Sequence, residues 1–321
     1  MYLKPIDANL YESCLEKYPF QNYEQSIYAA NKLIDEGYAI EYLGYFNQEE
    51  CLACCMIATL PIMKVFKSAW IPKGMVIDYT DKALLQSFTR ALKSYLYDLK
   101  VIYLEIDPMI YSQQRDKDGT VVPNGLNNFE MIDNLISCGF EKQEDSSHFI
   151  SGIDLTYRTS DEIYEEFSNS TCQNIQMAKA MGIKVKEISN EDVNWEEVEH
   201  MNRFFNNQIH VLVSYKVDED TQQEIYLDYF CFIEYGKEIV YIASKNNDFY
   251  SKYAIHWYMI QQAIHSGYYF YSFNELNPVF QQGKDGYDDF DFTRGFNAVV
   301  YELMGNYILP VNRSLYSMYK K

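Results

Sequence analysis

The sequence predicts an α/β (α+β) fold of two similar units, each built around a mixed sheet. A chain of 321 residues is about twice the size of a typical domain. Two stretches of it repeat the same order of helices and strands. Aromatic residues make up 17% of the chain, which implies extensive packed cores and excludes wholesale disorder. We therefore expect an internally duplicated unit.

The first stretch predicts a helix, two strands, a second helix and a closing strand, from its apolar spacing. In order, these elements are expected at 23–36, 39–45, 51–60, 81–99 and 101–106. The second stretch has the same order. Its elements are expected at 195–207, 229–234, 238–244, 251–265 and 268–273. Each unit should thus contain helices packed on strands.

A polar segment, 107–128, follows the first stretch and contains two Pro and two Gly. Its composition predicts a long loop, and loops of that length are usually functional or mobile. We then expect a helix near 129–137, closed by Gly139, and a strand at 148–155.

Thr159 and Glu162 have the spacing of a capping box. We expect one long helix from there to Met181. Gly182 can end it before a strand at 183–188.

The charge of the chain limits its partners. It carries 27 basic and 46 acidic residues, a formal charge of −19. This argues against DNA as a partner and against a chain-wide hold on anionic lipid, but it permits a local basic groove. Residues 60–100 have an excess of basic side chains, which fits either a phosphate-facing region or a solvated helix face.

The first residues carry no apolar run, and the most apolar stretch, 51–63, is too short to cross a bilayer. We expect a soluble, cytoplasmic protein. Cys51, Cys54 and Cys55 are expected as reduced residues buried on a strand. We expect no metal site there, because no second Cys/His pair stands at a suitable distance.

The sequence lacks the motifs G-x-x-x-x-G-K-[ST], G-x-S-x-G and H-E-x-x-H. Nucleotide hydrolysis and zinc hydrolysis are therefore disfavoured. No cofactor and no metal are expected.

Residues 69–108 read AWIPKGMVIDYTDKALLQSFTRALKSYLYDLKVIYLEIDP. This block resembles the Fem family (FemABX) of peptidoglycan-bridge aminoacyltransferases, in which an I-P-[RK]-G segment precedes a D-Y-x-D helix start and a strand ends in Asp-Pro. Residues 20–33, FQNYEQSIYAANKL, and residues 292–316, which begin FTRGF, are also similar to family segments. The resemblance spans nearly the whole chain.

The resemblance implies two GNAT-like domains, residues 1–147 with 304–321 and residues 148–303, the last strand of the chain returning to the first domain. It implies transfer of an amino acid from aminoacyl-tRNA to the stem peptide of a peptidoglycan precursor, lipid II or UDP-MurNAc-pentapeptide, forming the interpeptide bridge. Aminoacyl-tRNA is then a donor substrate rather than a cofactor, and peripheral contact with the membrane is compatible with this role. Without a long charged helical hairpin, the chain resembles the compact type that has no coiled-coil arm.

The resemblance also suggests residues that bind the acceptor. In the family, a basic residue on the leading helix of each domain holds the pyrophosphate of the acceptor, which implies Lys32 and Arg203 on opposite sides of one cleft. Tyr28, one helical turn before Lys32, is a further substrate-binding candidate, with a core position as its alternative. Lys73, in the I-P-K-G segment, is another.

An aminoacyl ester is already activated, so an amine can attack it without a metal or a protein nucleophile if both are held in register. Catalytic candidates by resemblance are Asp107, which could orient or deprotonate the incoming ammonium, and Arg294, which would stabilise negative charge near the ester. Glu302 is a third. A turn-capping role is the alternative for Asp107, and a structural role for Glu302.

The chain departs from the family pattern at two places. Cys172, Gln173 and Gln176 stand on the helix that usually carries an Arg, and Ser272 replaces an Asp. Another peptide or natural-product acceptor, or a non-catalytic paralogue, is therefore an alternative. An acetyl-CoA-dependent transferase is a further one by fold alone, although no Gly-rich loop stands at the expected turn.

Overall fold

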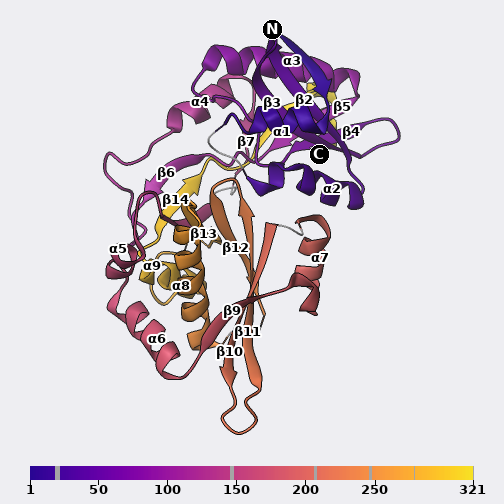
Figure 1. Cartoon of the computed structure of the whole chain (residues 1–321). Coiled ribbons are helices and arrows are strands. Elements are labelled where there is room, and N and C mark those ends of the chain that lie inside the picture. The colour runs from indigo at the N-terminus through magenta and orange to yellow at the C-terminus, as the bar shows by residue number, and fades with distance from the viewer. Residues whose placement is uncertain (19–21, 145–147, 206–207, 246–247, 278, 321) are drawn as a thin grey trace. The chain divides into compact units, whose positions relative to one another are not determined.

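In a computed structural model the chain forms two compact units (Figure 1). The structure describes residues 1–18, 22–144, 148–205, 208–245, 248–277 and 279–320. Unit 1 comprises Met1–Gln113, Asn124–His148 and Glu302–Lys321, and unit 2 comprises Gln114–Pro123 and Phe149–Tyr301. The expected domain assignment stays a prediction, and its boundary at residue 147 lies outside the described residues.

Unit 1 contains a mixed sheet with the strand order β1-β2-β3-β4-β5-β15-β7. Its strands are β1 (Tyr2–Ile6), β2 (Ala39–Asn47), β3 (Glu50–Pro61), β4 (Lys67–Ile71), β5 (Val101–Ile106), β7 (Glu141–Lys142) and β15 (Tyr307–Pro310). Its helices are α1 (Ala8–Leu15), η1 (Tyr23–Gln25), α2 (Ile27–Asp35), α3 (Lys82–Asp98), α4 (Phe129–Ser137) and α10 (Arg313–Tyr319). Asp81 caps α3, and Leu85, Phe88 and Leu92 of that helix are buried in the core at helical spacing.

A second mixed sheet has the order β6-β14-β8-β13-β12-β11-β10-β9. Its strands are β6 (Tyr111–Arg115), β8 (Phe149–Asp154), β9 (Lys184–Ile188), β10 (Ile209–Val217), β11 (Glu224–Tyr235), β12 (Glu238–Ser244), β13 (Phe270–Leu276) and β14 (Val299–Leu303). The helices of unit 2 are α5 (Ser160–Glu165), α6 (Asn169–Ala180), η2 (Asn190–Asp192), α7 (Glu196–Phe205), α8 (Phe249–His265) and α9 (Tyr287–Gly295).

The two sheets share a strand order, which confirms the expected α/β class with mixed sheets. In β1-β2-β3-β4-β5 and in β9-β10-β11-β12-β13, three antiparallel pairs are followed by one parallel pair. An antiparallel strand then follows in each sheet, β15 beside β5 and β8 beside β13. Because β15 is the last strand of the chain, the expected return of that strand to the first unit is confirmed.

Most of the expected helices and strands are present, and their ends are marked by the expected residues. Thr159 and Glu162 form the capping box of α5, while Gly139 and Gly182 have the positive φ of residues that end a helix. The expected helix at 195–207 is α7, and the last two residues of that range lie outside the described residues.

The single long helix expected from Thr159 to Met181 is wrong, since α5 and α6 are separate helices. The break comes at Ser168, whose side chain accepts a hydrogen bond from the backbone of Thr171 and so begins α6. The backbone N–H of Ser168 donates instead to the carbonyl of Gly295. The expected loop at 107–128 also needs correction, because β6 lies inside it.

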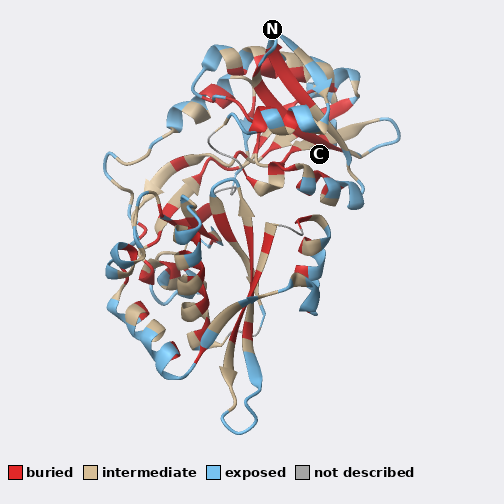
Figure 2. Cartoon of the chain, in the orientation of Figure 1, coloured by how far each residue is buried: buried red, intermediate tan, exposed pale blue. Residues whose placement is uncertain are grey.

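Buried residues are concentrated on the strands and on the helix faces that cover them (Figure 2). Cys51, Cys54 and Cys55 are buried on β3, as the sequence predicts. In the described part of the chain, no helix has both the length and the apolar character needed to span a membrane.

Candidate functional site

Asp107 lies directly after β5 and accepts hydrogen bonds on both carboxylate oxygens. Its Oδ1 accepts from the indole nitrogen of Trp70 at 3.0 Å and from the backbone nitrogen of Lys73 at 2.9 Å. Its Oδ2 lies 3.2 Å from Lys73 Nζ. The carboxylate is therefore fixed in position by three N–H donors, which is what an orienting group requires.

Lys73 is held between two carboxylates and is only 17% exposed. Its Nζ lies 3.0 Å from Glu24 Oε2 and also pairs with Asp107. Burial alone would lower the pKa of Lys73, but the two carboxylates outweigh it and hold the pKa above its ordinary value. Lys73 is therefore charged but already paired, so binding a substrate phosphate would require it to exchange partners.

The I-P-K-G segment folds as the sequence requires. Lys73 and Gly74 both have positive φ, and a Cβ on Gly74 would lie 2.8 Å from the backbone of Pro108. The amide of Gln25 donates to the carbonyls of Lys73 and Gly74. These contacts turn the backbone N–H of Lys73 toward Asp107, which explains why a glycine and an Asp-Pro step occur together.

Lys32 and Tyr28 lie one turn apart on α2, on the surface of unit 1. Lys32 makes a loose ion pair with Glu36 at 3.9 Å, with about a third of its side chain exposed. Tyr28 is 38% exposed, so it is not a core residue. Both side chains are accessible to a ligand.

Arg203 is exposed near the end of α7 in unit 2, with its guanidinium 5.4 Å from the ring centre of Phe204. Because Arg203 and Lys32 belong to different units, their meeting across one cleft stays a prediction. Glu302 lies in β14 with a half-buried side chain, and its carbonyl accepts a hydrogen bond from Ser112 Oγ at 3.0 Å. Its catalytic role is likewise still a prediction.

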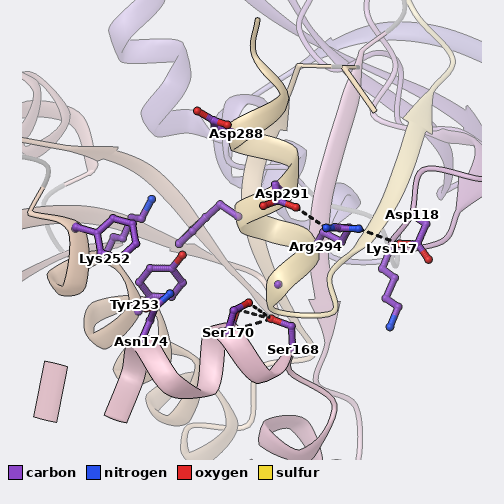
Figure 3. Close-up of a pocket in the computed structure, with 14 residues that line it drawn as sticks. Lys117, Asp118, Ser168, Ser170, Asn174, Lys252, Tyr253, Asp288, Asp291 and Arg294 are labelled. Atoms are coloured by element: carbon purple, nitrogen blue, oxygen red, sulfur yellow. Dashed lines mark hydrogen bonds and ion pairs between the residues drawn. The ribbon is translucent and has the colours of Figure 1, made fainter. Parts of the chain in front are cut away.

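Arg294 projects from α9 into a cavity of about 750 Å³, which we call the outer cavity (Figure 3). Its Nη2 lies 2.5 Å from Asp291 Oδ1 and its Nη1 lies 3.4 Å from Asp118 Oδ1. The outer cavity is lined by polar and charged groups that include Lys117, Ser170, Asn174, Lys252, Tyr253 and Asp288. Among the described residues, three cations and three carboxylates line it.

Two glycines allow close packing between segments that line the outer cavity. A Cβ on Gly295 would lie 2.4 Å from Thr171 Oγ1, so the R-G-F segment can pack against α6 only with glycine there. Gly119 has positive φ and lies under the ring of Phe280, which positions the turn that carries Lys117 and Asp118.

A second cavity of about 420 Å³, the inner cavity, lies where two parallel strands part. Pairing between β12 and β13 covers only Glu238–Val240 against Phe270–Ser272, although both strands continue beyond it. Tyr241 and Ser244 of β12 and Phe273 of β13 line the opening. Phe249, Lys252, Asp288 and Phe292 line both cavities.

Lys252 lines both cavities and was not predicted from the sequence. Its Nζ lies 4.6 Å from the ring centre of Phe292 and 5.3 Å from that of Phe249. Burial lowers the pKa of Lys252 and outweighs the opposing effect of Asp289 and Asp288. Its flanking aromatic residues in the segment FYSKY were the only available signal, and in a chain with 31 tyrosines that signal is weak.

Comparison with known proteins agrees with this organisation. A model of the FemAB family matches residues 6–206 and 195–321. Aminoacyltransferase FemA from Staphylococcus aureus strain bovine RF122 / ET3-1 is 22% identical over 404 aligned positions, which cover 98% of this chain and 96% of the relative. The FemA of strain MRSA252 matches to the same extent. Since this chain has 321 residues, FemA contains insertions that this chain lacks.

Solved structures show the same fold. The crystal structure of FemX superimposes with a TM-score of 0.81 and 13% identity, covering 100% of both chains. A tandem GNAT protein from the clavulanic acid biosynthesis pathway superimposes with a TM-score of 0.54 and 9% identity, covering 97% of this chain and 98% of its own. The expected GNAT-like fold is therefore confirmed for this chain.

Proposed function

The chain belongs to the FemAB family, and on that premise we propose that it is an aminoacyltransferase that builds the interpeptide bridge of peptidoglycan. The donor is aminoacyl-tRNA, and the acceptor is the stem peptide of lipid II or UDP-MurNAc-pentapeptide. The observation that carries the proposal is the family match over nearly the whole chain, together with relatives named as aminoacyltransferases over 98% of it.

The reaction needs positioning more than chemical assistance. The amine of the acceptor attacks the ester carbonyl, a C–N amide bond forms and the C–O ester bond breaks. The amine loses a proton, and the 3′-terminal ribose oxygen of the tRNA leaves as a hydroxyl. Because the ester is already activated, holding the two reactants in register can supply much of the acceleration without a cofactor.

The two cavities of unit 2 support binding of the donor. Arg294 and Lys252 are cations at the outer cavity, where they could meet a phosphate or the developing oxyanion. Lys117 adds a third cation from the turn after β6. In this proposal these cations would compensate for the absence of a basic residue at Cys172, Gln173 and Gln176 on α6.

Unit 1 supports binding of the acceptor. Asp107 has a fixed carboxylate that could orient the incoming ammonium. Lys32 and Tyr28 are accessible on α2, where they could meet the pyrophosphate and its neighbours, and Arg203 would contribute from unit 2. In this scheme Lys73 orients Asp107. Glu302 is a further catalytic candidate, near the reacting ester. A lipid-linked acceptor would require peripheral contact with the membrane.

The test uses purified protein, a mixture of radiolabelled aminoacyl-tRNAs and each acceptor in turn. Label should move to lipid II or to UDP-MurNAc-pentapeptide, with release of uncharged tRNA. Failure with every charged tRNA and both acceptors would overturn the proposal.

Two controls identify what a negative result means. Transfer of label to other small peptides would retain the enzyme class and change the acceptor. A gel shift with charged tRNA that is abolished by moderate salt would show electrostatic binding to the tRNA phosphates. The absence of any gel shift would favour a non-catalytic paralogue.

A further inference from the structure

The inner cavity contains a buried hydroxyl group that the fold does not use. Ser151 lies in β8 with 0% of its surface exposed, and it lines the cavity. Its Oγ has no hydrogen-bond partner among the described residues. Because a buried polar atom without a partner is costly, such an atom on a residue that lines a cavity points to a ligand.

The pairing of β8 with β13 is interrupted at Ser151. Gly152 pairs with Ser272 and Ile150 with Glu275, so β13 is irregular opposite Ser151. Asn274, within the irregular segment, has the positive φ of a left-handed residue. This irregular segment of β13 lies beside the point where β12 and β13 part. The cavity between these strands therefore extends to β8, the strand that carries Ser151.

Carboxylates outnumber cations around the inner cavity. Among the described residues, Asp228, Glu275, Asp288 and Asp289 line it, against the single cation Lys252. His256 adds no charge near neutral pH, because burial, helped by Lys252, lowers its pKa to about 3. The buried carboxylate of Asp228 is held by the backbone N–H groups of Tyr229 and Asp248, at 2.9 Å each.

The remaining walls are aromatic. Phe230, Tyr241, Phe273 and Phe292 surround the space. Aromatic faces and carboxylates together favour a compact cation. The volume of about 420 Å³ lies in the range of small-molecule sites.

We propose that the inner cavity binds the aminoacyl group of the donor and selects it by its positive charge, with Ser151 hydrogen-bonded to that group. This inference rests on the proposed function. In an aminoacyl ester the aminoacyl group carries an ammonium on its α-carbon and no free α-carboxylate. The aminoacyl group is therefore positively charged. A neutral acyl group, such as acetyl, has no charge for these carboxylates to bind. The cavity thus distinguishes an aminoacyl donor from other acyl donors.

The test measures binding without any transfer reaction. The probes are L-alanine amide, which is a cation, and 3′-alanylamino-3′-deoxyadenosine, a stable amide mimic of the charged tRNA end. Their N-acetyl derivatives are the uncharged controls. Isothermal titration should show that N-acetylation weakens binding by about tenfold or more. Equal affinity for the charged and acetylated forms, or no binding by either charged probe, would overturn the inference.

Variants locate the binding in the inner cavity. Ser151→Ala should weaken binding of the charged probes by about fivefold while raising the melting temperature, because it removes a buried hydroxyl without a partner. Ser151→Leu should place a larger, apolar side chain at the cavity wall and abolish binding. The matched control is Ser214→Ala, since Ser214 is also fully buried in unit 2 but donates to Ser251 Oγ at 2.8 Å. It should lower the melting temperature and leave affinity unchanged.

The two proposals fail separately. If the charged probes bind with this response to Ser151 but no label is transferred, the cavity assignment stands and the proposed reaction fails. If label is transferred but Ser151→Ala and Ser151→Leu bind the probes as the wild type does, the cavity assignment fails and the reaction stands.

Discussion

At the residue scale, Lys73 and Lys32 illustrate how differently two lysines of one unit can be used. Lys73 neutralises Glu24 and Asp107 in a mostly buried setting, whereas Lys32 has only a loose, exposed pair. We expect Lys73→Met to lower the free energy of unfolding by about 2 kcal/mol, because it leaves the carboxylates without their cation. Urea denaturation measures this loss. A change below about 0.5 kcal/mol would contradict it.

Lys32→Met is the matched control for stability and also a test of function. Its loose surface pair should contribute less than about 0.5 kcal/mol to stability. If Lys32 and Arg203 hold the acceptor pyrophosphate, Lys32→Met and Arg203→Met should each weaken binding of UDP-MurNAc-pentapeptide by about tenfold. Calorimetric titration tests this, and unchanged affinity in both variants would remove both residues from the site.

At the element scale, His210 links three neighbouring strands of the second sheet. Its Nδ1 lies 2.8 Å from Glu187 Oε1 on β9, and its Nε2 lies 3.2 Å from Glu234 Oε2 on β11. Burial alone would lower the pKa of His210, but the two carboxylates outweigh it and raise the pKa above its ordinary value of 6.5. The protonated ring is therefore favoured by folding.

The sign of the resulting pH dependence follows from this shift. A raised pKa contributes stability that is fully present below about pH 6.5 and is lost as pH rises through the folded-state pKa. The free energy of unfolding should therefore fall from pH 6 to pH 8.5 by more in the wild type than in His210→Gln. His265→Gln, at an exposed helix end, should retain the wild-type difference. Parallel pH profiles for wild type and His210→Gln would refute the assignment.

The same scale shows which elements could be predicted from sequence. Helices with a wide apolar face, such as α3, and central strands with an apolar run, such as β3, were predicted because burial imposes their periodicity. The break between α5 and α6 was missed, because Ser168 can either continue a helix or cap one. Its hydrogen bond to Gly295, far along the chain, decides between them.

The residues of the candidate site also differ in whether they could be predicted from the sequence. Asp107 and Gly74 could be found because a local motif fixes them, and the structure shows the turn that requires them. Lys252 and Ser151 could not, because their significance comes from a cavity formed by strands and helices distant in sequence. A lone lysine on a helix and a lone serine on a strand have no pattern of their own.

At the scale of the whole molecule, each sheet contains five strands that are consecutive in the sequence, β1–β5 or β9–β13, and is extended by a strand from elsewhere in the chain. β5 needs β15, which arrives from the end of the chain. Tyr307 and Leu309 of β15 are fully buried in the core of unit 1. The N-terminal 113 residues therefore contain most of this sheet but not all of its core.

Truncation tests this dependence. A chain that ends at Gly305 loses β15 and its two large buried side chains, which should cost unit 1 about 5 kcal/mol or more. Hydrogen exchange in β3 and β5 should then become fast, while β10 and β11 in unit 2 keep their protection. A chain that ends at Asn312 keeps β15 and loses only α10, so β5 should stay protected. Equal protection of β5 in both truncated chains would show that unit 1 completes its core without the returning strand.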